Sequence, residues 1–483
     1  MVSRTIARGY KFGSRVAWRR KIIHRDTANP HLYCIGGSGS GKTRLLYHLC
    51  IQEIEESLLN PGYQSVVIID PHGDLHRSIL NYIGTNMGRY FLDDNVVLIE
   101  PVLQDRGSIG LNVLETPPGI HPYETVDEVI ACFKTIWWRD WGARMEDILR
   151  NSCILLQKHN LTLAHMPRLL TDESFRDALV ESCDDRDVTM YWKSHFGSFK
   201  KNDRVFFVES TRNKVSQFIS NPYLRPILGQ QTSTVNFARE MAAGKVVLIC
   251  LSRDHLKTES RRLFGTLVFA GVHQALLSRN EQREEHRTPT SIYIDEAHEI
   301  FQPSLFLNVL EGGRKYKAAL NMFHQSLAQL EDDHVDIALG NTATQITFAV
   351  ARADAERMAK ESFTFTGKQV KHQERGLLFN KNSRPMYFSV QEEFENAVSE
   401  LMRQKVGQCY VKIKGQSQEP YVANTFKTKY AKIDEEKEDK LRALSAKYYN
   451  KPLDQIFQGI ESSEQAAIDR VKGLPAEPVS FRE

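Results

Sequence analysis

The sequence lacks long apolar runs. Nothing among its 483 residues approaches the stretch of about 18 apolar residues that a membrane-spanning helix needs. The longest candidate lies between Leu263 and Leu277, but His273 and Gln274 interrupt it, and its pattern is typical of a buried helix. We therefore expect no membrane span in this chain and no secretory signal.

Cysteine is scarce and scattered. The seven cysteines stand at positions 34, 50, 132, 153, 183, 250 and 409, and no two of them are spaced as Cys-x-x-Cys. This distribution argues against a disulfide framework and against a zinc site. It indicates the reducing cytoplasm as the expected location.

The sequence also lacks a large excess of either charge: it has 63 Lys and Arg and 60 Asp and Glu, for a net charge of +3. The total says little about nucleic acids, because their binding needs a basic face rather than a basic sum. The charge is uneven, however: residues 1–30 hold eight Lys or Arg and one acid, Asp26. We expect a basic N-terminal arm there, which either contacts phosphates or is a solvated tail.

Short β-branched runs alternate with helical stretches along much of the chain. Continuous apolar strands separated by helices are typical of a parallel sheet covered on both faces. Between about 114 and 230 the pattern predicts helices with almost no strand. The strands are predicted at 65–70, 95–99, 245–251, 291–295, 318–324 and 344–350, with two more near a sheet edge at 385–390 and 408–413.

These patterns predict an α/β core interrupted by an all-helical subdomain. The predicted divisions are a basic arm at 1–30, the core at 31–113 and 231–426, the inserted helical subdomain at 114–230, and a charged helical and flexible tail at 427–483.

The most informative segment is HLYCIGGSGSGKT at 31–43, where an apolar run meets a glycine-rich turn and a helical pattern begins. Its spacing is that of the phosphate-binding P-loop. Glycines let successive backbone N–H groups point at one anion, and the helix N-terminus adds a positive dipole end. Lys42 would neutralise the β- and γ-phosphates, and the Thr43 hydroxyl would bind Mg²⁺. The predicted nucleotide-binding residues are Gly36, Gly37, Ser38, Gly39, Ser40, Gly41, Lys42 and Thr43.

A second apolar run, SIYIDEAH at 291–298, ends in two adjacent carboxylates. In a P-loop ATPase, Asp295 would hold Mg²⁺ through its water shell and Glu296 would polarise the attacking water. The alternative is that both acids only cap the following helix. Their position after a buried strand, in a chain that also has a P-loop, favours the catalytic interpretation.

Three further residues are candidates with open alternatives. Arg314, expected on a loop between a helix and a strand, is either a surface charge or an arginine finger that reaches the γ-phosphate of a neighbouring subunit. Gln325, at the tip of a predicted strand, either senses that phosphate or is a turn residue. Asp70 ends another predicted strand and is expected to border the nucleotide crevice.

Together these motifs resemble the HerA/FtsK superfamily of ring-shaped DNA-pumping ATPases, and within it the soluble relatives of conjugative type IV secretion coupling proteins. The resemblance extends from about 31 to 426. It is carried by GGSGSGKT at 36–43, IDPHGDL at 69–75, WGARMEDILRN at 141–151, KVVLICLS at 245–252, IDEA at 294–297, GRK at 313–315, HQ at 324–325 and RADAE at 352–356.

The resemblance implies a RecA-like P-loop fold, ATP and Mg²⁺ as ligands, and a homo-hexamer that moves DNA through a central channel. It implies that Arg314 acts across the subunit interface, that Gln325 is a sensor, and that Arg352 is a weaker second candidate for the intersubunit arginine. The helical insertion resembles the all-α domain near the DNA entry of coupling proteins. Relaxase, nuclease or secretion-channel proteins are possible partners.

We therefore expect an Mg²⁺-dependent ATPase that translocates DNA. The alternatives are a nucleotide-dependent ring scaffold and an ATPase for protein export or pilus assembly that pumps no DNA. Glu296 favours turnover over a scaffold, because a scaffold needs no water-activating carboxylate.

Overall fold

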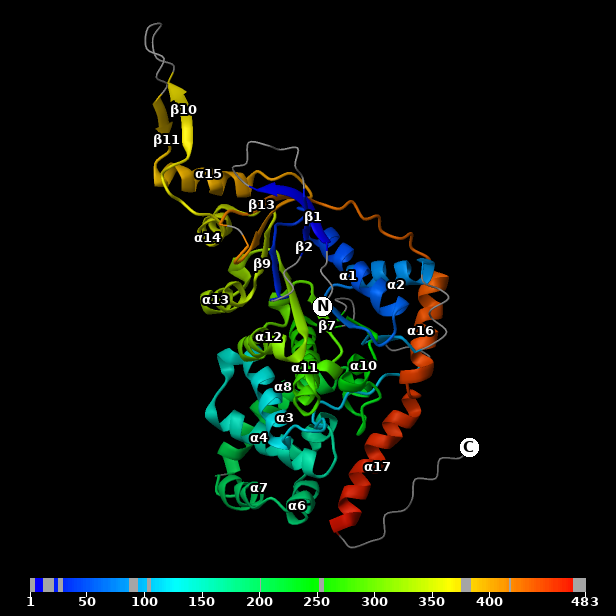
Figure 1. The fold of residues 1–483 in the computed structure, drawn as a ribbon. Coiled ribbons are helices and arrows are strands. Elements are labelled where there is room, and N and C mark those ends of the chain that lie inside the picture. The colour runs from blue at the N-terminus through cyan, green and yellow to red at the C-terminus, as the bar shows by residue number, and fades with distance from the viewer. Residues whose placement is uncertain are drawn as a thin grey trace, which may run out of the picture. The chain divides into compact units, whose positions relative to one another are not determined.

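The computed structural model describes residues 5–11, 21–24, 29–86, 94–101, 106–199, 201–251, 256–374, 384–416 and 418–471. The chain divides into two compact units, whose elements are labelled in Figure 1. Unit 1 comprises Met1–Ile54, Ser291–His298 and Phe306–Tyr430, and unit 2 comprises Glu55–Thr290, Glu299–Leu305 and Ala431–Glu483.

Unit 1 is built on a mixed sheet with the strand order β2-β1-β13-β12-β9-β3-β8-β7. Strand β3 pairs in parallel with β8 on one side and with β9 on the other, and all four of its residues are buried. Strand β12 pairs antiparallel with β9, and β13 and β1 continue the antiparallel edge. The P-loop segment therefore leaves a strand with parallel neighbours on both sides.

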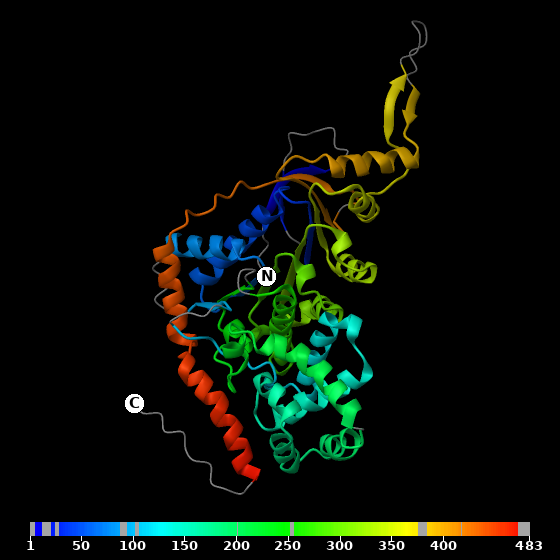
Figure 2. The same ribbon diagram turned by 180° about the vertical axis from the view of Figure 1, so that it is seen from behind.

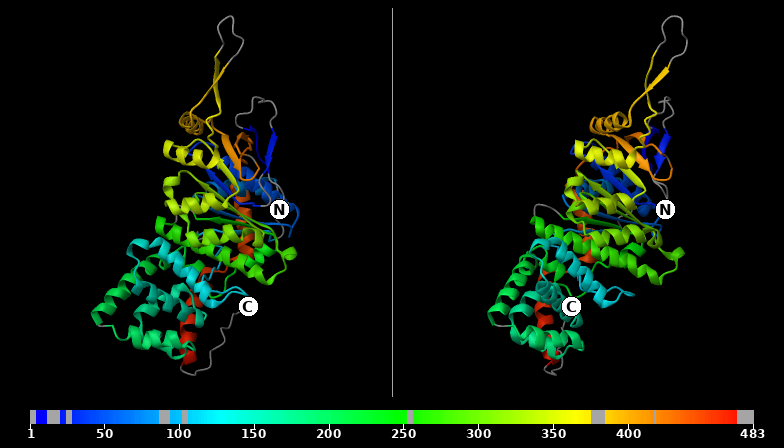
Figure 3. Two further views of the ribbon diagram at one scale, coloured as in Figure 1. Left: turned by 60° about the vertical axis from the view of Figure 1, so that its left-hand side comes forward. Right: turned by 90° about the vertical axis from the view of Figure 1, so that its left-hand side faces the viewer.

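Helices cover both faces of this sheet, with α1 on one face and α13 and α14 on the other (Figure 3). The arrangement follows from strand order, because right-handed crossovers that run in opposite directions along a parallel sheet lie on opposite faces. The bounds in unit 1 are β1 (Thr5–Lys11), β2 (Lys21–His24), β3 (Leu32–Ile35), α1 (Lys42–Leu59), β7 (Thr290–Ile294), η7 (Ala297–Glu299), α12 (Pro303–Tyr316), β8 (Ala318–His324), η8 (Leu327–Gln329), α13 (Asp332–Asn341), β9 (Thr344–Thr347), α14 (Arg352–Ser362), β10 (Val370–Glu374), β11 (Arg384–Tyr387), α15 (Val390–Met402), β12 (Gln408–Ile413) and β13 (Tyr421–Thr425).

Two parts of unit 1 differ from the sequence-based expectation. The predicted strand at 385–390 is not part of the main sheet: among the described strands β11 pairs with β10 alone, and this hairpin extends away from the other strands of the unit (Figures 1 and 2). The predicted basic arm contains β1 and β2, which join the antiparallel edge. Residues 1–4, 12–20 and 25–28 of that arm lie outside the described residues.

Unit 2 contains the parallel strands β4, β6 and β5, with β6 in the middle. Between β5 and β6 the described elements are all helices. The bounds in unit 2 are β4 (Ser65–Asp70), α2 (Asp74–Asn86), β5 (Val96–Ile99), α3 (Pro122–Ile136), η2 (Trp138–Asp140), α4 (Ala143–Lys158), η3 (Leu163–His165), α5 (Met166–Thr171), α6 (Glu173–Glu181), α7 (Arg186–Met190), a π-helical turn (Tyr191–Phe196), α8 (Lys201–Ile219), α9 (Arg225–Leu228), α10 (Phe237–Ala242), β6 (Val246–Cys250), α11 (Thr258–Leu277), η5 (Ser278–Glu281), η6 (Glu284–His286), α16 (Glu435–Tyr449) and α17 (Leu453–Val471).

The parallel strands and the helices between them confirm the predicted α/β fold class, and none of the described helices is long and apolar enough to cross a membrane. Strands β4 and β8 have the predicted bounds, because each is a short, mostly apolar run that is buried along its whole length. The proposed domain boundaries remain predictions.

The charged C-terminal segment is more ordered than a solvated helix with a loose tail. Helix α16 packs against α2 and β5, and α17 packs against α6 (Figure 2). Asp434 caps α16 by accepting the amide of Lys437. On the buried side of α16, Leu441 is 5% exposed and Glu438 is 4% exposed, so the helix is part of the core of unit 2.

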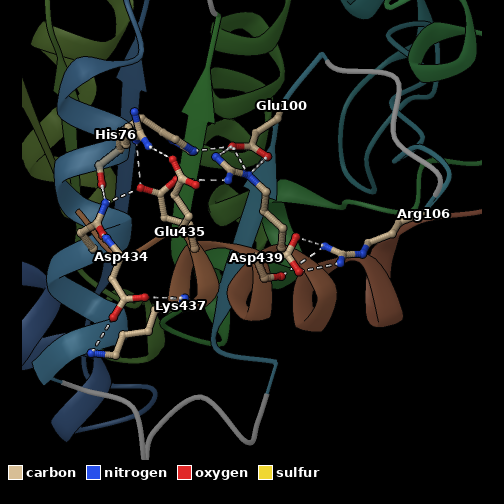
Figure 4. A network of polar contacts seen from close by, with 11 residues as sticks. His76, Glu100, Arg106, Asp434, Glu435, Lys437 and Asp439 are labelled. Carbon is tan, nitrogen blue, oxygen red and sulfur yellow. Dashed lines mark hydrogen bonds and ion pairs between the residues drawn. The ribbon is translucent and has the colours of Figure 1, made fainter.

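A network of polar contacts links α16 to α2 and to Glu100, which follows β5 (Figure 4). Glu100 accepts a hydrogen bond from His76 at 2.8 Å and pairs with the Arg442 guanidinium at 3.0 Å. On the same face Glu438 pairs with Arg77 at 3.0 Å. Burial opposes ionisation of Glu100, but the hydrogen bonds and charges of His76 and Arg442 outweigh it and lower the pKa of Glu100 to about 2.

We expect Glu100→Gln to destabilise unit 2. The pKa of this carboxyl is lower in the folded chain than its ordinary value of 4.5, so its stabilising effect is complete above that value and is lost as the pH falls toward 2. The shift corresponds to roughly 3 kcal/mol at neutral pH. Thermal unfolding between pH 2 and pH 7 should show a lower midpoint for the variant at neutral pH, and the two proteins should converge near pH 2.

The matched control is Asp439→Asn, which removes an exposed ion pair between α16 and Arg106. Exposed pairs contribute little, so its midpoint should stay near that of the parent. Equal unfolding midpoints for the parent and Glu100→Gln at pH 7 would mean that the ionised Glu100 carboxylate does not stabilise unit 2.

Candidate functional site

The P-loop joins β3 to α1 in unit 1. Three backbone hydrogen bonds shape its turn: the Gly37 amide donates to Ala349 at 2.8 Å, the Ser40 amide donates to Gly37 at 3.2 Å, and the Leu45 amide donates to Gly41 at 3.1 Å. The amides of the first turn of a helix have no partner within it. Helix α1 begins at Lys42, so its N-terminus carries donors and a positive dipole end suited to an anion.

Two glycines of this turn have backbone angles that only glycine adopts readily. Gly39 has φ +75° and Gly41 has φ +109°. A Cβ on Gly41 would lie 3.0 Å from the amide nitrogen of Gly407, whereas a Cβ on Gly39 would meet nothing within 4 Å. The turn is thus packed against a second segment at Gly41 and open at Gly39.

The acid pair follows β7 directly, as the sequence predicts. Asp295 is 6% exposed and Glu296 is 3% exposed. The Asp295 Oδ1 accepts the amide of Glu296 at 3.1 Å, and Glu296 has φ +45°, which is rare for a residue with a side chain. Such strain persists only where the surroundings impose it, and it occurs most often at functional sites.

Lys42 and Glu296 form a buried ion pair although 254 positions separate them. The Lys42 Nζ lies 2.5 Å from the Glu296 Oε1, and both side chains are about 5% exposed. The Gln325 amide donates to the same oxygen at 3.0 Å. Three elements of the sheet of unit 1, the turn after β3 and the ends of β7 and β8, therefore meet at one carboxylate.

The second oxygen of Glu296 is buried and makes no hydrogen bond within the described residues. The His298 Nδ1 lies 3.5 Å from it, and the other ring nitrogen of His298 lies 3.2 Å from the Gln329 side-chain amide. A carboxylate that polarises water needs one oxygen that can still accept a hydrogen bond. In Glu296 this is Oε2, while Lys42 and Gln325 hold the carboxylate in place through Oε1.

His324 is a feature that sequence reasoning did not single out for its chemistry. It ends β8, is fully buried, and neither ring nitrogen has a hydrogen-bond partner among the described residues. Burial, reinforced by the nearby His298 and Lys42, holds the pKa of His324 well below its ordinary value. The ring is therefore neutral, and it stacks at a tilt on Tyr33 with 5.2 Å between ring centroids. The one sequence signal that could have drawn attention to His324 is its position directly before Gln325, the predicted sensor.

A pocket of about 380 Å³ lies over these groups. All of its lining residues belong to unit 1, and they fall into three sets: the P-loop, the two side chains of Glu296 and Gln325, and a wall made by residues 406–407 and 424–430. The lining is Gly37, Ser38, Gly39, Gly41, Lys42, Thr43, Arg44, Glu296, Gln325, Val406, Gly407, Asn424, Thr425, Phe426, Lys427 and Tyr430.

The residues present fit a magnesium–nucleotide. The Thr43 hydroxyl lines the pocket, the Asp295 carboxylate is buried beside Glu296, and hydroxyl and carboxylate oxygens are ligands that Mg²⁺ prefers. Gly36 and Ser40 lie in the turn itself, where a Cβ on Gly36 would meet Ser40 at 2.7 Å.

Three predicted residues lie outside this cluster. Arg314 is in the last turn of α12 rather than on a loop, and it is exposed. Arg352 begins α14 and pairs with Glu356 and Glu395 at 2.8 and 2.9 Å. Asp70 belongs to unit 2, where its carboxylate accepts the backbone amides of His72, in the turn after β4, and of His76, in the first turn of α2.

A parallel sheet with a glycine turn, a buried lysine and a strand-end acid pair defines the fold of a P-loop nucleotide-binding protein. Comparison of the sequence with protein-family models and with curated proteins gives no match. Solved structures, by contrast, resemble most of the chain.

Among them is the unbound form of the bacterial conjugative coupling protein TrwBdeltaN70, with 17% identity and a TM-score of 0.56 over 86% of this chain and 88% of that one. TrwB in complex with a non-hydrolysable ATP analogue gives 16% identity and a TM-score of 0.57 over 90% and 97%. VirB4 of Thermoanaerobacter pseudethanolicus has 12% sequence identity and a TM-score of 0.54, over 88% of this chain and 97% of that one. The chain thus has the fold of these proteins, which confirms the P-loop fold that the motif resemblance implies.

We expect Gly41→Ala to impair phosphate binding much more than Gly39→Ala. Both replacements meet a positive φ and cost roughly 1–2 kcal/mol, but only the first also drives a methyl group against the Gly407 backbone. Calorimetric titration with magnesium and inorganic tripolyphosphate should show a much larger loss of affinity for Gly41→Ala. Equal losses in the two variants would mean that packing against Gly407 does not hold the turn.

Proposed function

We propose that this protein is an Mg²⁺-dependent ATPase motor that translocates DNA, assembled as a homo-hexamer. The observation that carries the ATPase part is the cluster of Lys42, Glu296 and Gln325 in the pocket over the P-loop. Lysine and loop amides suit the phosphates, Thr43 and Asp295 suit the metal, and the unbonded oxygen of Glu296 suits the attacking water.

The solved structures support the same ligands. TrwB has been determined with ADP and Mg²⁺ and with non-hydrolysable analogues of ATP and GTP, and its fold resembles that of this chain across nearly its full length. DNA as the transported polymer rests on the motif resemblance and on the description of TrwB as a conjugative coupling protein. The scattered cysteines support a cytoplasmic setting.

Lys42 and Gln325 have different roles in the proposed reaction. Lys42 holds phosphate charge at the helix N-terminus, and its ammonium also orients Glu296 before the phosphates arrive. Gln325 donates to the same carboxylate, so it links the position of Glu296 to whatever occupies the γ-phosphate position. Bound Mg²⁺ would neutralise the charge that develops on the phosphates.

Arg314 is the better candidate for an arginine that acts on a neighbouring subunit. It is exposed, and within the described residues no ion pair occupies its guanidinium. Arg352, in contrast, is held by two glutamates of its own unit. An arginine finger needs a free guanidinium, since it must bind the charge that develops in the transition state of another active site.

The decisive experiment measures ATP hydrolysis with and without DNA. We expect magnesium-dependent turnover that duplex or single-stranded DNA stimulates, and no turnover in Lys42→Ala, which serves as the blank. Glu296→Gln should still bind ATP but lose about 100-fold or more in turnover, because the water loses its base.

The matched control is Glu361→Gln, an exposed glutamate of α14 outside the pocket, which should hydrolyse ATP at the parental rate. Turnover that DNA leaves unchanged would refute translocation and favour a protein-export ATPase or a ring scaffold. A Glu296→Gln variant with parental turnover would refute the role of the carboxylate.

Subunit mixing tests Arg314. Arg314→Ala and Lys42→Ala proteins, each inactive alone, should regain ATPase activity when they are mixed. An Arg314→Ala subunit keeps Lys42 and can receive the intact Arg314 of a Lys42→Ala neighbour, so some interfaces hold a complete site. A mixture without activity would exclude action across an interface. Arg352→Ala is the matched control and should hydrolyse ATP at the parental rate, because Glu356 and Glu395 of its own unit hold Arg352.

A further inference from the structure

The pocket has a second wall that phosphate binding does not use. Beyond the P-loop, its lining is completed by Val406 and Gly407 and by Asn424, Thr425, Phe426, Lys427 and Tyr430. These residues come from the turn before β12, from the end of β13 and from the segment that follows β13. A pocket of this volume is in the range that binds small molecules and cofactors, and it exceeds what a phosphate chain alone occupies.

Backbone hydrogen bonds tie this wall to the P-loop. The Gly407 amide donates to the Ser40 carbonyl at 2.8 Å, and the Thr425 amide donates to the Gly407 carbonyl at 2.9 Å. The second wall therefore keeps a fixed spacing from the phosphate cradle. A ligand that bridges the two must have a phosphate end and a flat or apolar end.

Side chains of α1 hold residues 426–430 in place. The His48 ring packs on Phe426 with 4.9 Å between centroids, and the His48 Nδ1 lies 2.7 Å from the Thr428 hydroxyl. The fully buried Tyr47 packs against Tyr430 with 4.7 Å between ring centroids. Helix α1 thus positions both the phosphate-binding end of the pocket and the aromatic end.

Tyr430 presents an aromatic ring to the pocket. It is 42% exposed although Tyr47 packs against it, and the Arg44 guanidinium lies 5.7 Å from its ring centroid. Burial raises the pKa of Tyr430, so the phenol is neutral and does not repel a phosphate ligand. A planar ring beside a guanidinium is a surface on which a nucleobase stacks well.

We propose that the wall formed by residues 424–430 is the nucleobase subsite, with Tyr430 as the residue that packs on the base, and that it selects purine over pyrimidine nucleoside triphosphates. This inference rests on the proposed nucleotide-binding function and extends it. A two-ring purine covers more of the tyrosine than a pyrimidine does. Stacking does not distinguish the edges of adenine and guanine, so ATP and GTP bind alike.

The test compares four ligands on the parent and two variants. Dissociation constants of ATP, GTP, CTP and inorganic tripolyphosphate, each with magnesium, are measured by calorimetry for the parent, Tyr430→Ala and Tyr430→Phe. The parent should bind ATP and GTP with similar affinity and CTP more weakly. Tyr430→Ala should weaken ATP and GTP about tenfold, while tripolyphosphate, which has no base, should bind as it does to the parent. Tyr430→Phe should keep parental affinities, because the ring remains.

Tyr387→Ala is the matched control. This tyrosine is 52% exposed, lies on β11 in the same unit and does not line the pocket, so all four affinities should stay unchanged. Unchanged tripolyphosphate binding also shows that Tyr430→Ala is folded.

Three results would overturn the inference while leaving the nucleotide site intact. Equal weakening of ATP and tripolyphosphate by Tyr430→Ala would mean that the ring only supports the P-loop. Unchanged ATP affinity in that variant, or CTP binding as tight as ATP binding in the parent, would refute the base contact or the purine preference. A parent that binds neither ATP nor tripolyphosphate would refute the proposed function itself.

Discussion

The ion pair between Lys42 and Glu296 is the interaction on which the rest of unit 1 depends. Two charges are held almost without water at 2.5 Å, and desolvation makes such a pair costly unless further donors satisfy the carboxylate. Gln325 supplies one such donor from the end of β8. The pair forms only if β3, β8 and β7 are in register, so the geometry of the site and the order of the strands constrain each other.

The strand pattern of the core was predictable because the parallel strands are buried on both faces. Runs such as 65–70 and 318–324 are mostly apolar and are buried along their whole length, and both are strands with those bounds. The P-loop and the acid pair were predictable for a different reason. Their residue types and spacing follow from the chemistry of phosphate and Mg²⁺, which leaves few alternatives.

Other features depend on tertiary contacts and have no local signal. Whether 385–390 belongs to the main sheet or to a separate hairpin is decided by which strand it pairs with, and its composition is the same in both cases. The sequence of α16 suggests a solvated helix because acids and bases are interspersed along it. In the structure, however, Glu438 accepts a hydrogen bond from Asn81 of α2, and Arg442 pairs with Glu100, directly after β5. The placement of Arg314 on a helix was missed because Gly312 and Gly313 weaken the helical pattern before it.

The hydrogen bond from Gly407 to Ser40 limits how far the chain can be shortened before the P-loop loses its shape. Every residue of the P-loop, the acid pair and the glutamine lies before position 330, but the P-loop turn is hydrogen-bonded to and packed against Gly407, far downstream in the chain. Strand β12, which begins at Gln408, holds that backbone by pairing with β9. A truncated chain that ended before this strand would retain all of these motif residues and still lack the scaffold that gives them their shape.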